Sequence, residues 1–140
     1  LEAAGTDREQ TDGLIAAEVV KQLEANKDKP FFLACGFFRP HTPYVAPKAY
    51  FDRFPPAGFP LPEVPANHRD TAPAAAFLSA KKEQEKLTDD LRRQALQAYH
   101  ASTTFMDAQL GVVLDALTKE GLADRTIVVF LSDHGYHLGE

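Results

Sequence analysis

Two short stretches of the chain concentrate the side chains that could do chemistry. The first is Ser132-Asp133-His134-Gly135, which directly follows an apolar run ending at Leu131. Carboxylate oxygens and an imidazole nitrogen are both metal ligands, so the Asp133-His134 pair could hold a divalent cation. In the alternative interpretation, the same residues form a polar turn that only caps a following helix.

The second stretch is Arg39-Pro40-His41-Thr42-Pro43, which also follows an apolar run. The two prolines favour an extended and rigid backbone around His41. The sequence therefore predicts a second ionisable side chain held at the end of a strand. The alternative is a surface loop in which this histidine has no role.

The elements that must position these stretches alternate along the chain. The wholly apolar run Phe31–Phe37 and the largely apolar run Thr126–Leu131 predict two buried strands. Apolar residues at helical spacing predict helices near 12–25 and 88–119. The alternation predicts an α/β fold with mainly parallel central strands flanked by helices. Such sheets bind ligands at the carboxyl ends of their strands, so a functional site requires both stretches to meet at one rim.

The ends of the two predicted helices carry recognisable signals. Thr11 or Asp12 could cap the first helix, and Asn26 is well placed for its end. Thr88 is predicted to cap the second helix, and Gly121 is predicted to end it.

A proline-dense segment, residues 44–75, separates the first strand from the second helix. Prolines exclude regular helix or central strand over most of it, and its aromatic residues argue against disorder. We expect a long functional loop that lines a pocket near His41. The single cysteine, Cys35, lies in the first apolar run and is predicted to be a small buried hydrophobe.

Length and termini bound the domain organisation. The 140 residues suffice for one modest domain. The chain starts at Leu1 rather than Met and ends at Gly139-Glu140, inside a predicted site loop. We therefore expect residues 1–140 to be a single partial domain, cut from a longer protein.

Composition restricts the partners. A net charge of −5 argues against non-specific nucleic-acid binding, which needs a basic face. No apolar stretch approaches the ~20 residues that span a bilayer, so no membrane span is expected. Two strands form a small core with exposed edges, which predicts self-association through those edges.

Four segments, in this order, resemble the sulfatase family of the alkaline-phosphatase-like superfamily. They are Lys29-Pro30-Phe31-Phe32-Leu33, Arg39–Pro43, Tyr99–Leu117 and Thr126–Glu140. Within the family, the chain is most similar to the iduronate-2-sulfatase-like branch. The resemblance implies hydrolysis of a sulfated small molecule or glycan, with a formylglycine nucleophile and bound Ca²⁺. It also implies a periplasmic, secreted or lysosomal setting.

The resemblance also implies roles for individual residues. Asp133 and His134 would be two of the Ca²⁺ ligands. His41 would contact the sulfate or protonate the leaving oxygen, a role that suits a group titrating near neutral pH. Arg39 and His137 are candidates for contacting an anionic substrate.

Three departures from the family pattern limit what this chain could do. Formylglycine forms within a Cys/Ser-x-Pro-x-Arg motif, which occurs nowhere here, and Cys35 is followed by Gly36-Phe37-Phe38. The upstream acidic pair that completes the family's Ca²⁺ site is absent too, as is the lysine expected shortly after Gly139-Glu140. We therefore expect the chain on its own to be inactive and to bind Ca²⁺ weakly or not at all, because such sites need about six oxygen ligands. Two alternatives remain: a phosphomonoester or phosphonate hydrolase of the same superfamily, and a non-catalytic α/β binding module.

Overall fold

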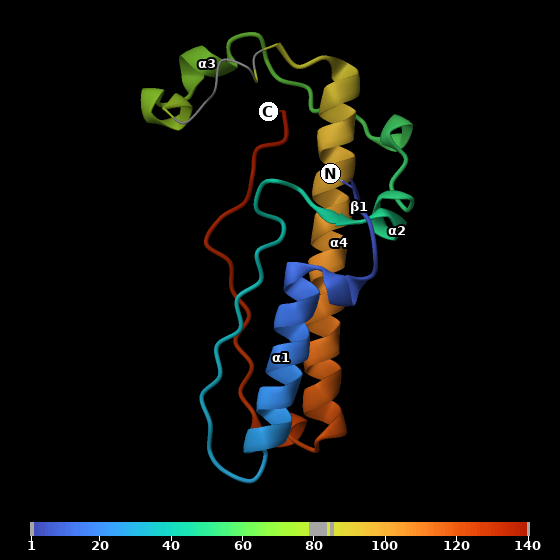
Figure 1. Ribbon diagram of the computed structural model, residues 1–140. Helices are drawn as coiled ribbons and strands as arrows, with labels where there is room; N and C mark the ends of the chain where they lie inside the picture. The colour runs from blue at the N-terminus through green and yellow to red at the C-terminus, as the bar shows by residue number, and fades with distance from the viewer. Residues whose placement is uncertain (1, 79–83, 85, 140) are drawn as a thin grey trace.

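The two predicted helices form the frame of the computed structural model, which describes residues 2–78, 84 and 86–139. Helix α1 spans Thr11–Asn26 and helix α4 spans Asp89–Lys119. Helix α1 packs along the C-terminal half of α4 and runs in the same direction (Figure 1). The prediction of helices near 12–25 and 88–119 is confirmed, and α4 is a single continuous helix.

Two apolar clusters hold these helices in place. The first joins the C-terminal parts of α1 and α4 and consists of Val19, Leu23, Ala116, Leu117 and Leu122. The second joins the middle of α4 to short helix α2 (Lys48–Phe51) and consists of Ala46, Phe51, Ala98, Ala101 and Phe105. Phe105 is only 1% exposed, so the second cluster has an aromatic centre on α4.

Helix α4 ends as its sequence predicts. The Thr88 hydroxyl accepts a hydrogen bond from the backbone N–H of Leu91 at 3.3 Å, which confirms the N-cap. At the other end, Gly121 has φ of +67°, a left-handed conformation that favours glycine. The N–H of Gly121 donates to Thr118 and that of Leu122 to Leu117, which forms a Schellman motif.

The prediction for the start of α1 is wrong. Its N-cap is Gln10, which makes no side-chain capping hydrogen bond. Asp12 is 1% exposed and points away from the helix end, toward another segment. The next residue, Gly13, lies against the 3₁₀ helix η1 (Asp7–Glu9), where a Cβ atom would meet the carbonyl oxygen of Asp7 at 1.8 Å. This close approach requires glycine.

In the described part of the chain, the sheet is small and lies elsewhere than predicted. Strand β1 (Glu2–Ala3) pairs in parallel with β2 (Ala46–Pro47), with Glu2 opposite Ala46. The runs 31–37 and 126–131 are extended but form no hydrogen-bonded ladder (Figure 1). Their prediction as two buried central strands is therefore not met here. Parallel strands need several neighbours and cover on both faces, and this chain offers only two such runs.

These two extended runs expose apolar side chains. Phe32 is 96% exposed and Ile127 is 93% exposed. Cys35 is also exposed, so its prediction as a buried hydrophobe is wrong. The runs nevertheless point the same way, because Arg125 donates to the carbonyl of Lys27 at one end and the segments meet again at the other end.

The proline-dense segment is irregular, as predicted. After α2 it contains only the 3₁₀ helix η2 (Pro56–Gly58), the short helix α3 (His68–Thr71) and the 3₁₀ helix η3 (Ala74–Phe77). The 3₁₀ helix η5 (Ala123–Arg125) leads from α4 into the last extended run. In the described residues, no helix is both long and apolar enough to cross a bilayer.

Candidate functional site

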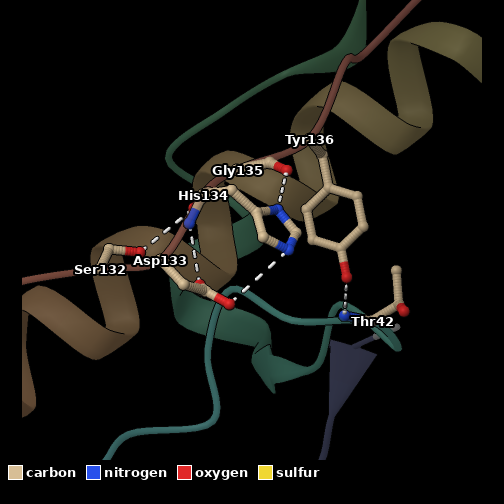
Figure 2. A network of polar contacts seen from close by, with 6 residues as sticks. All are labelled: Thr42, Ser132, Asp133, His134, Gly135 and Tyr136. Atoms are coloured by element: carbon tan, nitrogen blue, oxygen red, sulfur yellow. Dashed lines mark hydrogen bonds and ion pairs between the residues drawn. The ribbon is translucent and has the colours of Figure 1, made fainter. Parts of the chain in front are cut away.

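The two chemistry-bearing stretches converge at one end of the extended runs. The backbone N–H of Thr42 donates to the hydroxyl of Tyr136 at 3.4 Å, across 94 residues of sequence (Figure 2). The rings of His41 and Tyr136 meet edge to face, with centroids 6.0 Å apart. The rings of His134 and Tyr136 are 6.4 Å apart. His41 and the Asp133-His134 pair therefore meet at the same end of the two extended runs, as predicted, although these runs form no sheet.

Local hydrogen bonds shape the turn that carries Asp133 and His134. The backbone N–H of His134 donates to Asp133 Oδ1 at 2.9 Å, and the hydroxyl of Ser132 donates to the carbonyl of His134 at 3.1 Å. His134 Nδ1 lies 2.8 Å from the carbonyl oxygen of Gly135 (Figure 2). The turn thus presents both side chains to solvent, with 89% of Asp133 and 72% of His134 exposed.

The contact with Gly135 determines which ring nitrogen of His134 is free. A carbonyl oxygen only accepts hydrogen bonds, so Nδ1 must carry the hydrogen. When the ring is neutral, Nε2 then has a lone pair, and it lies 3.6 Å from Asp133 Oδ2. The turn therefore places two metal-ligating atoms beside each other. When the ring is protonated, the same two atoms form an ion pair.

Electrostatics favour the ionised form of Asp133. The hydrogen bond from the backbone N–H of His134 lowers the pKa of Asp133, and the positive charge of protonated His134 lowers it further. The charge of His41 acts in the same direction. At neutral pH this carboxylate is charged and available to a cation.

His41 presents one free ring nitrogen. Its Nδ1 lies 2.7 Å from the carbonyl oxygen of Thr42, so Nδ1 is the donor and Nε2 is free to exchange a proton. The guanidinium of Arg39 donates to the carbonyl of His41 at 3.3 Å. Both prolines of this stretch follow cis peptide bonds.

Tyr136 is the centre of an aromatic cluster that the sequence did not predict. Its ring packs edge to face against Tyr44 at 5.7 Å and against Tyr99 at 6.2 Å. Tyr44 and Tyr99 also contact each other at 5.5 Å. Burial raises the pKa of Tyr44 above its ordinary value. The cluster fixes the site turn against α4 and the proline-dense segment, and no local pattern signals a contact between such distant rings.

Asp12 is a second functional candidate that the sequence analysis missed. Its Oδ1 accepts the backbone N–H of Phe38 at 2.9 Å and its Oδ2 accepts that of Arg39 at 3.0 Å. A signal did exist, because Asp12 lies in helical register with the buried residues Ala16, Val19 and Leu23. A carboxylate on the apolar face of a helix requires a buried partner.

Other predicted site residues are less integrated. His137 is exposed, and no hydrogen bond, ion pair or ring contact joins it to the rest of the described chain. The described residues contain no group of three or more metal-ligating side chains, so Asp133 and His134 stand as a pair.

Residues 56–60 of the proline-dense segment line an open depression of about 720 Å³ with Asp90 and Arg93. His41 is not part of its lining, so the predicted pocket near His41 is not this one.

Comparison with known proteins gives one consistent result. The sulfatase family profile matches residues 4–140. A sulfatase of Formosa agariphila is 36% identical over 127 residues, covering 87% of this chain and 25% of the relative. Iduronate 2-sulfatase of Homo sapiens is 32% identical over 151 residues, covering 96% of this chain and 26% of the relative. Choline-sulfatase of Rhizobium meliloti is 31% identical over 133 residues, covering 90% of this chain and 26% of the relative.

The chain thus spans about a quarter of the length of these relatives. The match runs through both site stretches and both long helices, and it confirms the predicted α/β class with an alkaline-phosphatase-like fold. The two site stretches converge, and the sulfatase profile matches almost the whole chain, from residue 4 to residue 140. This chain therefore belongs to the sulfatase family.

Proposed function

We propose that this chain forms one wall of the active site of a sulfuric ester hydrolase. The observation that carries the proposal is the convergence of His41 with Asp133 and His134 around Tyr136. Family membership supports the reaction class. A non-catalytic binding module would not require an ionisable pair and a free imidazole at the same rim.

His41 acts as the proton donor or contacts the sulfate in this proposal. Its hydrogen bond to the Thr42 carbonyl orients the ring and leaves Nε2 exposed toward solvent. A protonated Nε2 can give its proton to the oxygen of the leaving alcohol, as a general acid does.

Asp133 and His134 hold part of a Ca²⁺ site in this proposal. The donor set fits in part: Asp133 supplies hard oxygen ligands and His134 supplies Nε2. Ca²⁺ takes about six to eight ligands, mostly oxygens, so residues outside this chain must complete the site. When bound, the cation would neutralise the sulfate oxygens and favour an ionised nucleophile. The nucleophile, a formylglycine by family resemblance, would also come from outside this chain.

The substrate in this proposal is a sulfated small molecule or glycan. Two further side chains could contact an anionic substrate. Arg39 begins the first stretch, and His137 lies two residues after the second. The Arg39 guanidinium already bridges to the His41 carbonyl, which leaves further N–H groups for an anionic substrate.

The chain on its own is a partial domain in this proposal, without sulfatase activity and with weak or no Ca²⁺ binding. Its exposed runs, with Phe32 and Ile127 almost fully exposed, favour self-association through unpaired backbone edges. Sedimentation of the 140-residue chain should show concentration-dependent oligomers. A strictly monomeric chain, tight calorimetric Ca²⁺ binding or turnover of a sulfate ester would each contradict this part.

The test uses the full-length protein that contains this chain. Aryl sulfate hydrolysis is measured for the wild type, for His41→Ala and for Asp133→Asn. His68→Ala, in α3, and Asp28→Asn, on an exposed turn, are the matched controls. We expect losses of about a hundredfold or more in the two site variants and none in the controls. Preferential hydrolysis of a phosphate monoester or phosphonate ester would favour the alternative within the superfamily, and binding without turnover would favour the non-catalytic module.

A further inference from the structure

Asp12 is the most deeply buried ionisable side chain of the described structure, at 1% exposed. A carboxylate in that position is stable only if hydrogen bonds replace its lost hydration. Both oxygens have such a partner, the backbone N–H of Phe38 on one and that of Arg39 on the other. The location of Asp12 in the first turn of α1 adds the favourable field of a helix N-terminus.

The two N–H groups whose hydrogen bonds Asp12 accepts belong to Phe38 and Arg39, three and two residues before His41. The carbonyl of Phe38 accepts the backbone N–H of His41 at 2.9 Å, which closes a turn over Phe38–His41. Asp12 therefore holds the beginning of the turn whose end carries the imidazole. Amides 32–36, earlier in the same extended run, make no hydrogen bond within the described chain, so this clamp is what fixes the run at its site end.

The clamp itself is anchored to the rest of the fold. Gly13 packs against the carbonyl of Asp7, and the carboxylate of Asp7 accepts hydrogen bonds from Tyr50 at 2.6 Å and from Gln109 at 2.8 Å. Gln109 belongs to α4 and is 3% exposed. A continuous set of contacts thus runs from α4 through η1 and Asp12 to the His41 turn.

We propose that Asp12 is a positioning residue for His41, whose buried carboxylate holds the Phe38–His41 turn so that the imidazole faces Tyr136 and Asp133. This inference rests on the function proposed above only for its catalytic consequence. The local clamp can be tested in the full-length protein without measuring its activity.

The first experiment measures amide hydrogen exchange by NMR. In the full-length wild-type protein, the amides of Phe38 and Arg39 should exchange at least about tenfold more slowly than unfolded amides do, because they donate to a buried carboxylate. Asp12→Asn keeps the size of the side chain but replaces one of its two acceptor oxygens by an NH₂ group, which cannot accept. The protection of the Phe38 and Arg39 amides should therefore fall by about tenfold. Asp28→Asn makes the same charge change on an exposed turn and should leave it unchanged.

Unprotected amides at both Phe38 and Arg39 in the wild type would overturn the proposal without any variant having to fold. A loss of protection spread evenly over α1 and α4 in Asp12→Asn would also overturn it, because the residue would then only stabilise the fold.

The second experiment is a double-mutant cycle on sulfate-ester turnover by the full-length protein. If Asp12 acts through His41, Asp12→Asn should lower kcat by about tenfold in the wild type, with little change in KM, and have almost no effect in the His41→Ala background. An equal loss in both backgrounds would contradict a positioning role. A wild-type protein that turns over no sulfate ester would contradict the proposed function, whereas the exchange experiment would still decide the clamp.

Discussion

The hydroxyl of Tyr136 accepts the backbone N–H of Thr42 at 3.4 Å, and it is the hydrogen bond that links the two site stretches in the described structure. The same ring contacts His41, His134 and two other tyrosines. Tyr136 therefore joins the residues proposed for proton transfer to those proposed for cation binding, without carrying either role itself.

Replacing Tyr136 separates its two contributions. Tyr136→Phe keeps the ring and removes the hydroxyl, so the Thr42 amide should exchange about fivefold faster, equivalent to about 1 kcal/mol. Tyr136→Ala also removes the ring contacts and should shift the NMR signals of the His41 ring protons. Unchanged exchange of Thr42 in Tyr136→Phe would show that the hydrogen bond does not form in solution.

The aromatic centre of the second core cluster should dominate stability. Phe105 is 1% exposed and contacts the Tyr50 ring at 5.5 Å. Phe105→Ala should lower the free energy of unfolding by about 3–5 kcal/mol, because it leaves a cavity in a packed interior. Urea unfolding of the wild type and of Phe105→Ala measures this difference in the free energy of unfolding. The control is Phe32→Ala, where the side chain is 96% exposed and the loss should be small. Equal losses in both variants would contradict the assignment of the core.

The N-cap of α4 gives a smaller and more local effect. Thr88→Ala leaves the backbone N–H of Leu91 without its side-chain acceptor and should cost about 1 kcal/mol. Thr104→Ala is the matched control, because its exposed hydroxyl only bonds back to the His100 carbonyl within the helix. Thermal unfolding of both variants should rank Thr88→Ala as the less stable. The reverse ranking would argue that α4 starts elsewhere.

Alkaline pH should destabilise the fold through Tyr50. Burial raises the pKa of Tyr50, and its hydrogen bond to the Asp7 carboxylate raises it further. A tyrosine whose pKa is higher folded than unfolded stabilises the fold fully below the unfolded value, ~10, and loses that contribution as pH rises toward the folded value. Stability should therefore fall above about pH 10, and less steeply in Tyr50→Phe. Urea unfolding between pH 8 and 11 measures both slopes, and identical slopes would contradict this role.

Local signals in the sequence were sufficient for the helices and for the convergence of the two chemistry-bearing stretches. Helical spacing identified α1 and α4, and Thr88 and Gly121 marked the ends of α4. The pairing of a histidine turn with Asp133-His134 was predicted from the parallel course of two apolar runs. That course is observed even though the runs form no ladder.

Other features depend on contacts that no local pattern encodes. Strand pairing at 31–37 and 126–131 requires neighbouring strands, which this chain does not supply. Tyr136 meets Tyr44 and Tyr99 only after the chain has folded. Asp12 was one of two cap candidates because aspartate is a favoured N-cap residue, although its register with Ala16 on the buried face indicated a buried partner.

The central claim is that His41 and Asp133 belong to one sulfatase site, and a double-mutant cycle in the full-length protein tests it most directly. Each of His41→Ala and Asp133→Asn should lower kcat/KM for a sulfate ester by about a hundredfold or more. The double variant should be little slower than the slower single variant, because residues that act as a unit are not additive. Wild-type turnover by either single variant, or full additivity of the two losses, would contradict the account.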